Sequence, residues 1–370
     1  MSAAVLHSAS ASAPCSEHSA SIRAVTNDTS DLNTAGKAGD SDELYAVYPH
    51  GSGHNGVMID PRLITLRTFA ACGTVAATAE LTGYSPSAVS GQLRELQHSL
   101  GMTLLVKDGR GLRLTATGRH LVRRSDRLIA EWEEIRASSL TAGDHTPSHF
   151  GIGGFSTASS NLLAPLAAKL RGAHPDVGVH VIEASPARCF ELLVAERIDL
   201  AVVVAMQGEV QVEEDPRFDK IDLLDDPLDV MVPSDHEVAE RESVSLAELA
   251  GEEWISAGPG SPYHALFVAA FTAAGVTPTV AHETIEWETS AALVGAGVGV
   301  SLIPRLASSL GEANVTRVRL SGSGRLSRKI IAAVRAGSRD SPFIKESLAH
   351  LRTTSRHILS TRLDETPATA

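Results

Sequence analysis

The sequence contains few cysteines and no long apolar run. Cys15, Cys72 and Cys189 are its three cysteines among 370 residues, too few and too scattered for a disulfide framework or a metal site. No segment reaches the ~18 consecutive apolar residues that a membrane-spanning helix needs. The first residues also lack the basic and apolar regions of a secretory signal. We therefore expect a chain of the reducing cytoplasm, in which Cys189 is either a buried small side chain or a redox sensor.

The motifs of catalysis and cofactor binding are missing as well. Gly151-x-Gly-Gly stops short of a dinucleotide fingerprint, and Gly295-x-Gly-x-Gly lacks the preceding strand that this fingerprint requires. The 15 histidines show no metal-ligand spacing such as His-Glu-x-x-His. Ser156 and Thr157 have no recognisable histidine or aspartate partner. We predict no catalytic residue, no metal and no cofactor, so the protein is not an enzyme.

The chain has no overall excess of positive charge. Its net charge of −12 argues by itself against nucleic-acid binding. The acidic excess, however, includes residues 213–215 and 225–226, whereas residues 107–127 carry seven basic and two acidic residues. A locally basic segment suits a protein that binds DNA without coating it; a solvated charged face is the alternative. The basic residues are Lys107, Arg110, Arg113, Arg119, Arg123, Arg124 and Arg127.

Two short helices are predicted after an N-terminal arm. Residues 1–57 are rich in Ser, Ala, Gly and Asp, so we expect them to be disordered. From about Met58, apolar residues recur at helical spacing until Gly73, which ends the first helix. Thr74 is placed to cap a second helix over Val75–Thr82.

A third helix has the pattern of a DNA-reading helix. Gly83-Tyr84 makes a turn, Ser85 is a favourable N-cap, Pro86 suits the first helical position, and Gly101 ends the helix. One face is apolar (Val89, Leu93, Leu96, Leu100), and the opposite face is small and hydrogen-bonding, then basic. Such a face can enter the major groove, although an ordinary surface helix would also be amphipathic. The predicted DNA contacts in this helix are Ser85, Ser87, Ser90, Gln92 and Arg94.

The segment after this helix is predicted to be a wing. Leu104-Leu105-Val106 is a short apolar strand, residues 108–111 form a glycine-rich turn, and Leu112-Arg113-Leu114 alternates as a return strand. Arg110 and Arg113 are placed to lie along a phosphate backbone or enter the minor groove. Strand, basic turn and strand directly after a reading helix favour DNA binding.

A long helix follows, from Thr115 to about Ser139. Leu121, Leu128 and Ile135 recur every seven residues, as in a short coiled-coil seam; a core helix is the alternative. Because each chain has one reading helix, we expect a homodimer or homotetramer. It should bind a pseudo-palindromic operator in double-stranded DNA, with half-sites about one helical turn, ~10 base pairs, or a multiple of it apart.

A set of short motifs runs without gaps from the end of the first helix to the start of the long one. They are Gly73-Thr74-Val75, Ala79-Glu80, Gly83-Tyr84-Ser85-Pro86-Ser87-Ala88-Val89-Ser90, Gln92-Leu93, Leu96, Leu100-Gly101, Leu104 and Leu114-Thr115-x-Thr117-Gly118. With this spacing, the segment resembles the DNA-binding domain of LysR-type transcriptional regulators. Four positions depart from the family's usual residues: Thr82 replaces Leu, Gln97 replaces Glu, Leu105 replaces Phe and Lys107 replaces Arg. These departures alter side-chain packing and one charge. The resemblance implies transcription regulation by effector-controlled DNA binding.

Beyond the long helix, strands and helices alternate, which predicts a parallel sheet covered on both faces. The resemblance, looser here, extends over about residues 58–352. It implies an α/β fold class: an all-α-dominated winged helix-turn-helix, then an effector domain of two Rossmann-like lobes of the type 2 periplasmic-binding-protein fold. We expect the chain to cross between lobes near Asp226 and Gly324, and a final helix near Ser341–Arg352. The predicted boundaries are 58–116 for the winged helix-turn-helix, 117–142 for the linker helix, 143–355 for the effector domain (lobe I about 148–226 and 325–355, lobe II about 227–324) and 356–370 for a flexible tail.

The effector site is predicted at the carboxyl ends of the strands, where ligands of open sheets bind. Ser156 and Thr157 stand between a strand and a helix, so their hydroxyls and nearby N–H groups suit a carboxylate. N-capping is the alternative role. Apolar neighbours favour a small organic acid with a hydrophobic part over a sugar. The predicted effector contacts are Phe155, Ser156, Thr157, Ser185, Ala205, Met206 and Ser261.

Two other functions stay open from the sequence. One is a solute-binding protein of the periplasmic-binding fold whose N-terminal helices only dimerise, against which the basic wing and the missing signal segment argue. The other is an architectural DNA protein without an effector, which leaves the two-lobed half unexplained. DNA binding by residues up to about 142 would separate the first of these from a regulator.

Overall fold

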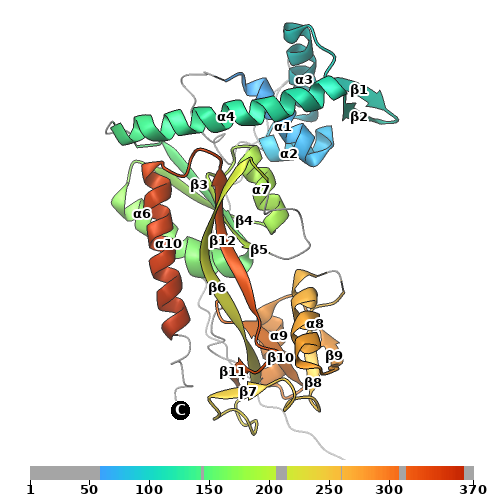
Figure 1. The fold of residues 1–370 in the computed structure, drawn as a ribbon, viewed down its shortest axis with the longest axis vertical. Coiled ribbons are helices and arrows are strands. Elements are labelled where there is room, and N and C mark those ends of the chain that lie inside the picture. Colours follow the sequence, from blue (N-terminus) through green and yellow to red (C-terminus); the bar gives the residue numbers. More distant parts are fainter. Residues whose placement is uncertain (1–58, 143–145, 206–214, 260, 308–313, 362–370) are drawn as a thin grey trace, which may run out of the picture. The chain divides into compact units, whose positions relative to one another are not determined.

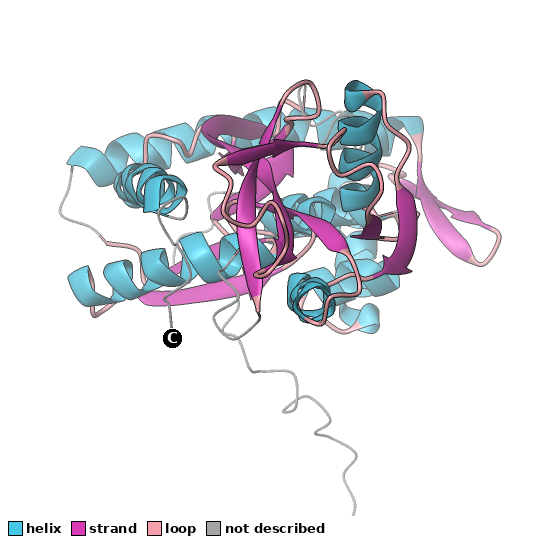
Figure 2. Cartoon of the chain, turned by 90° about the horizontal axis from the view of Figure 1, so that it is seen from below, coloured by secondary structure: helices cyan, strands magenta, loops and turns pink. Residues whose placement is uncertain are grey.

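The computed structural model describes residues 59–142, 146–205, 215–259, 261–307 and 314–361. The predicted arm, residues 1–57, and the predicted effector contact Met206 lie outside these ranges. Figure 1 shows the order and arrangement of the elements, and Figure 2 shows helices lying along the strands. Within the described ranges, no helix is both long and apolar enough to cross a membrane.

Three helices open the described chain, and local signals set their ends as predicted. They are α1 (Pro61–Cys72), α2 (Val75–Thr82) and α3 (Pro86–Leu100). Thr74 Oγ1 accepts a hydrogen bond from Ala77 N at 3.1 Å, and Ser85 Oγ accepts one from Ala88 N at 3.2 Å. Each helix ends at a glycine with a left-handed backbone, a conformation that costs glycine least.

The predicted inner face of α3 is confirmed except at its last residue. Val89, Leu93 and Leu96 are buried in one cluster with Leu66 of α1. Leu100 is instead 41% exposed. It is the last residue of α3, so its side chain lies beyond the core that α1 and α2 supply.

A two-stranded antiparallel wing follows, as predicted. β1 (Leu105–Asp108) pairs with β2 (Gly111–Leu114). Gln97 of α3 joins the helix to the wing, because its Oε1 accepts hydrogen bonds from the N atoms of Leu104 and Leu105, both at 2.9 Å. An amide oxygen can accept these two bonds as a carboxylate would. The departure from Glu at this position therefore preserves the connection.

The long helix α4 (Ala116–Ala142) begins against the wing. Thr115 Oγ1 accepts a hydrogen bond from Gly118 N at 2.9 Å. A Cβ atom on Gly118 would lie 2.3 Å from the Leu104 carbonyl oxygen, so only glycine allows this close approach. This contact gives the Thr-x-x-Gly motif its structural reason.

The two sides of α4 differ in burial. Ser125, Ile129, Glu133 and Ala137 are buried against the rest of the chain. Leu128 and Ile135, seven residues apart, are 50% and 46% exposed. Two of the three predicted seam residues thus lie on the solvent side, and the core-helix alternative does not account for them.

The first lobe of the effector domain is a mixed sheet with helices on it. Its elements are β3 (His149–Gly154), α5 (Ser156–Ala158), a π-helical stretch (Ser159–Leu163), α6 (Ala164–Ala173), β4 (Gly178–Glu183), α7 (Pro186–Val194), β5 (Leu200–Ala205), β12 (Ser327–Arg335) and α10 (Pro342–Thr361). Strands β4, β3 and β5 are parallel, but β12 joins β5 antiparallel. The predicted parallel sheet is confirmed for β3, β4 and β5, whereas β12 is antiparallel because it returns from the other lobe.

The second lobe repeats this plan. Its elements are β7 (Ser243–Ser245), β8 (Glu253–Ser256), α8 (Pro262–Ala274), β9 (Thr279–Glu283), α9 (Trp287–Gly295), β10 (Val300–Pro304) and β11 (Val315–Ser321). Strands β10, β8 and β9 are parallel neighbours. Gly295-x-Gly-x-Gly forms the turn between the end of α9 and the start of β10.

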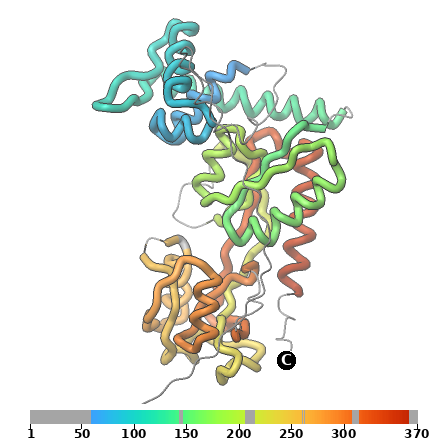
Figure 3. The backbone as a smooth tube through the Cα atoms, turned by 180° about the vertical axis from the view of Figure 1, so that it is seen from behind, coloured from blue at the N-terminus to red at the C-terminus, as the bar shows by residue number. Residues whose placement is uncertain are grey.

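Two strands connect the lobes. The long strand β6 (Phe218–Pro233) pairs antiparallel with β12, and the two run side by side from one lobe to the other (Figures 1 and 3). Asp226 lies within β6, and β12 begins shortly after Gly324. Ligands of such sheets bind at the carboxyl ends of the parallel strands. These ends therefore lie around β6 and β12.

The final helix is longer than the sequence predicts. It runs to Thr361, so residues 356–361 are helical rather than part of a flexible tail. Leu351 and Ser355 are buried, and Ile358 packs against the core of the first lobe. This packing extends the helix although polar residues dominate its last turns.

Candidate DNA-binding surface and effector pocket

The outer face of α3 carries exposed hydrogen-bonding and basic groups. Ser85 and Ser87 are exposed, with their hydroxyl oxygens 2.9 Å apart. Arg94 is also exposed, and its Nε donates to Ser90 O at 3.3 Å. Ser90 itself is half-buried. Short polar groups near the start of a helix and a guanidinium further along it suit base edges and phosphates.

Gln92 has a packing role that the sequence did not reveal. Its Oε1 accepts a hydrogen bond from Thr65 Oγ1 of α1 at 2.5 Å, and its side chain is half-buried. The carbonyl end therefore braces α3 against α1 instead of lying on the outer face with Arg94. Gln92 remains a weaker candidate for a DNA contact than Arg94.

The wing places two arginines in solvent. Arg110 lies in the turn between β1 and β2, and Arg113 is 58% exposed on β2. Arg113 Nε is 3.7 Å from Asp108 Oδ2, an exposed pair worth little. Both guanidinium groups can therefore turn to an approaching phosphate at small cost.

The winged helix-turn-helix, residues 59–114, is called the reading head, and it contacts the effector domain at α7 and at Arg197 just after it. Arg188 Nη2 is 2.6 Å from Glu80 Oε1 of α2, and Arg197 Nη1 donates to Leu81 O at 2.9 Å. Leu81 is fully buried in a cluster with Cys189 and other residues of the first lobe. In the family this Leu usually occupies the next position, which is Thr82 in this chain. Leu81 thus packs against the effector-domain core, and α2 and α7 are in direct contact.

The predicted effector turn is the first turn of a helix. Phe155 is the N-cap residue, and no side chain caps this helix. Ser156 and Thr157 are its first two residues, so the N-capping alternative is wrong for both. Thr157 is buried, and its Oγ1 has no hydrogen-bond partner among the described residues. An unpaired buried hydroxyl is unfavourable, which makes Thr157 a candidate ligand contact.

Two other predicted contacts cap helices. Ser185 Oγ accepts a hydrogen bond from Arg188 N at 3.4 Å at the start of α7. Ser261 Oγ accepts one from Tyr263 N at 3.3 Å at the start of α8. Ala205 is half-buried at the end of β5. These local roles explain the residue types without a ligand.

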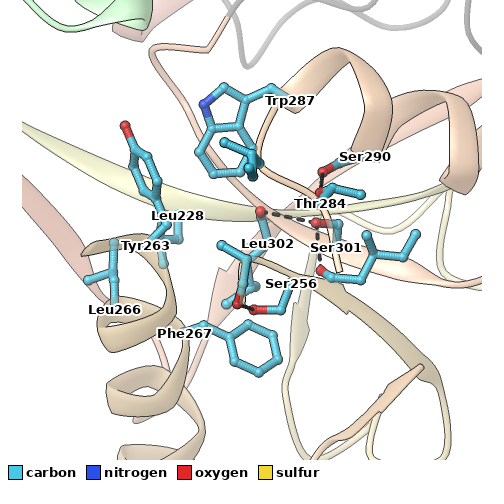
Figure 4. A pocket seen from close by; sticks show the side chains of 13 residues that line it. Leu228, Ser256, Tyr263, Leu266, Phe267, Thr284, Trp287, Ser290, Ser301 and Leu302 are labelled. Atoms are coloured by element: carbon cyan, nitrogen blue, oxygen red, sulfur yellow. Dashed lines mark hydrogen bonds between the residues drawn. The ribbon is translucent and has the colours of Figure 1, made fainter. Parts of the chain in front are cut away.

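A pocket of about 440 Å³, open mouth included, lies in the second lobe (Figure 4). It sits at the carboxyl end of β8, between α8 and the loop that leads into α9. The rings of Tyr263 and Trp287 meet edge to face at 5.0 Å. The hydroxyls of Thr284 and Ser290 hydrogen-bond each other at 2.6 Å, so the pocket presents mainly apolar surface. Its lining is Leu228, Ile255, Ser256, Ala257, Tyr263, Leu266, Phe267, Thr284, Ile285, Trp287, Ser290, Ser301 and Leu302.

None of the six described residues predicted as effector contacts lines this pocket. Its walls come from segments far apart in the sequence, so no local pattern joins them. One signal was present: aromatic residues make up only 4% of the chain, yet Tyr263 and Trp287 each stand at the start of a helix. Aromatic side chains are typical of the linings of ligand pockets.

A buried arginine stands where the lobes meet. Arg328 Nε donates to Asp226 Oδ2 at 2.8 Å, and both side chains are fully buried. The Arg328 guanidinium carbon lies 5.1 Å from the centre of the Phe155 ring in the first lobe and 5.7 Å from that of Tyr263 in the second. Burial raises the pKa of the Asp226 carboxyl above its ordinary value, and Arg328 opposes that rise. Neither Arg328 nor Asp226 stands in a sequence motif.

Cys189 has the environment of a core residue. It is fully buried in α7, and burial raises the pKa of its thiol to about 12. Redox-sensing cysteines are accessible and have lowered pKa values. Of the two interpretations offered by the sequence, the structure favours the buried small side chain.

Cys189 should therefore resist alkylation in the folded protein. At pH 8, a thiol of pKa 9.0 is about one-tenth thiolate, whereas a pKa of about 12 leaves about one part in ten thousand. We expect iodoacetamide to label Cys189 at least 100-fold more slowly in the folded than in the urea-unfolded chain, as read by peptide mass spectrometry. Equal labelling rates in the two states would restore the redox interpretation.

Comparisons with known proteins agree with this anatomy. Residues 62–119 match the family described as "Bacterial regulatory helix-turn-helix protein, lysR family", and residues 144–356 match "LysR substrate binding domain". Within the described part of the chain, no group of three His, Cys, Asp or Glu side chains is arranged to hold a metal ion.

The chain is similar to several named regulators. It is 30% identical over 273 residues to the HTH-type transcriptional regulator CatR of Pseudomonas putida, which covers 73% of this chain and 90% of that protein. It is 26% identical over 255 residues to the uncharacterized HTH-type regulator YybE of Bacillus subtilis, covering 69% and 85%. The fold resembles a full-length OxyR variant of Pseudomonas aeruginosa, with a TM-score of 0.56, 18% identity, and coverage of 79% of this chain and 97% of that one. The chain therefore belongs to the LysR family of DNA-binding transcriptional regulators with an effector-binding domain, and not to a family of enzymes.

Proposed function

We propose that this protein is a homodimeric or homotetrameric regulator that acts in the cytoplasm. It reads a pseudo-palindromic operator through α3 and the wing, and it responds to a small organic acid. The carrying observation is the division of α3 into a buried apolar face and an exposed face with Ser85, Ser87 and Arg94. Operator selection from random double-stranded DNA by the full chain tests the proposal, and a solute-binding protein would select no sequence.

Arg94→Ala should weaken operator binding by about 1–3 kcal/mol if the guanidinium contacts a base. Preference should then relax at one base position. A phosphate contact would instead weaken binding to all DNA sequences alike. It would also lower the slope of log binding constant against log salt concentration by about one. Fluorescence anisotropy on operator and scrambled DNA at several salt concentrations measures both.

Arg339→Ala is the matched control for this experiment. Arg339 is an exposed arginine of the effector domain. Arg136, which lies beside Glu133 and is only one-third exposed, would be a poorer control because its loss disturbs packing. Operator affinity that survives Arg94→Ala unchanged would mean that another face of α3 meets DNA.

The effector is proposed to lie between the two lobes. Its apolar part fits the pocket beside Tyr263, Phe267 and Trp287, and its polar part reaches the start of α5, where Thr157 offers an unpaired hydroxyl. An apolar pocket with a few convergent polar groups is the usual form of a small-molecule site. Because α7 begins at the same edge of the sheet and contacts α2 through Arg188, a ligand here has a short physical route to the reading head.

A further inference from the structure

The buried Arg328 has one hydrogen-bonding group that the described protein does not satisfy. Its Nε is paired with Asp226, and its Nη1 donates to the Tyr263 hydroxyl at 3.2 Å. Its Nη2 is buried and has no hydrogen-bond partner among the described residues. A buried guanidinium donor without an acceptor is costly, so the site is suited to an acceptor from outside.

The same chain shows how a buried arginine is satisfied when its role is structural. Arg335, also on β12, donates to Glu133 Oε1, to Asp199 Oδ1 and to the Ile198 carbonyl oxygen, each at 2.8 Å. All of these acceptors are its own chain's. Arg328 is paired with one carboxylate, that of Asp226, whereas Arg335 is paired with two. What Arg328 lacks by this comparison is a second carboxylate.

The surroundings of Arg328 suit a ligand with an apolar body. The guanidinium lies against the ring of Phe155 in one lobe and that of Tyr263 in the other. Phe155 directly precedes the helix whose Thr157 hydroxyl is unpaired, and Tyr263 lines the apolar pocket. Figure 4 shows the Tyr263 hydroxyl directed away from the pocket floor formed by Ser256 and Phe267.

We propose that Arg328 is the acid-recognising residue of the effector site, and that its ligand is a monocarboxylate with an aromatic or similarly compact apolar body. The carboxylate takes the Nη2 position beside Asp226, and the body enters the pocket of the second lobe. Because Arg328 touches both lobes, the ligand also holds them together. This inference rests on the proposed function, and it replaces the hydroxyls of Ser156 and Thr157 as the primary anchor.

Matched acid and amide pairs test the charge requirement. Phenylacetate and phenylacetamide, with longer arylalkanoate pairs beside them, are titrated into the full chain by calorimetry. We expect at least one acid to bind about 10–100-fold more tightly than its amide, the range of a hydrogen bond to a charged group. Equal binding of acid and amide, or no binding of any acid at 10 mM, overturns the proposal.

Two variants then assign the preference to Arg328. Asp226→Asn leaves the guanidinium without its internal carboxylate but keeps an acceptor, so acid binding should strengthen about tenfold. The pair Asp226→Asn with Arg328→Gln removes both charges and should abolish the acid preference, so that each acid binds no more tightly than its amide. Retained acid preference in the double variant sinks the assignment. Operator binding without ligand is measured throughout. If the unmodified chain binds no operator, the proposed regulatory function is refuted, whereas the proposed role of Arg328 is tested separately by the acid preference.

Discussion

Replacing Leu128 and Ile135 together by aspartate should reduce affinity for a two-half-site operator by about 10²–10⁴-fold, the usual gain from linking two binding modules. The two side chains are 50% and 46% exposed on the same side of α4, two helical turns apart. Exposed leucine and isoleucine at heptad spacing bury this area when a second helix packs on them. Carboxylates at both positions would face their counterparts in the partner helix and prevent that packing.

Sedimentation velocity at micromolar concentration and anisotropy on operator and half-site DNA measure this effect. The variant should sediment as a smaller species, and its half-site affinity should equal that of the unmodified chain because α3 is untouched. Thr141→Asp is the control, since it adds one carboxylate at an exposed position of α4 on a different face from Leu128 and Ile135. Unchanged sedimentation of the double variant would place the subunit interface elsewhere.

The reading head could be predicted from sequence because its signals are local. Thr74, Ser85, Gly73 and Gly101 act within one turn of their own positions, through a capping hydroxyl or a left-handed backbone. The buried and exposed faces of α3 follow from a period of 3.6 residues. Leu100 and Gln92 depart from this pattern because their surroundings depend on how α1 packs, which periodicity does not encode.

The effector half was harder to predict because its decisive contacts are distant in sequence. The antiparallel direction of β12 depends on a pairing between residues 327–335 and residues 200–205. Arg328 and Asp226 are 102 residues apart, and neither stands in a motif. Ser185 and Ser261 cap helices in the structure, and their role as ligand contacts stays a prediction, because a serine before a helix has the same sequence pattern whether it caps or binds. The residue type determines which hydrogen bonds each side chain can make. Only the fold shows which partners it meets.

A second large effect is expected at the junction of α4 with the effector domain. Arg335 and Glu133 are both buried and paired at 2.8 Å, and Arg335 also reaches Asp199. Gly337, just beyond, lies so close to α4 that a Cβ atom there would come 2.1 Å from the Ala130 carbonyl oxygen. The ion pair is therefore enclosed where the long helix meets the first lobe.

Arg335→Met should lower the free energy of unfolding by about 3–5 kcal/mol, because it removes one partner of a buried ion pair while its apolar volume is kept. Arg136 Nη1 still donates to Glu133 Oε2, but the distance of 3.5 Å and the one-third exposure of Arg136 make it a weaker partner than Arg335. Urea unfolding followed by circular dichroism measures the loss. Lys329→Met is the matched control on the same strand: its pair with Asp222 is exposed on both sides, so we expect a change below about 1 kcal/mol.

The double variant Glu133→Leu with Arg335→Met separates charge from packing. Once both charges are gone, position 133 no longer holds a buried carboxylate, and Asp199 still accepts a hydrogen bond from Gly151 N at 2.9 Å. We expect the double variant to regain at least half of the stability lost in Arg335→Met, since a well-packed apolar pair often matches a buried ion pair. A double variant no more stable than Arg335→Met would show that the guanidinium contributes mainly through Asp199 and the Ile198 carbonyl oxygen. The long helix would then be held to the effector domain by packing at Gly337 rather than by the ion pair.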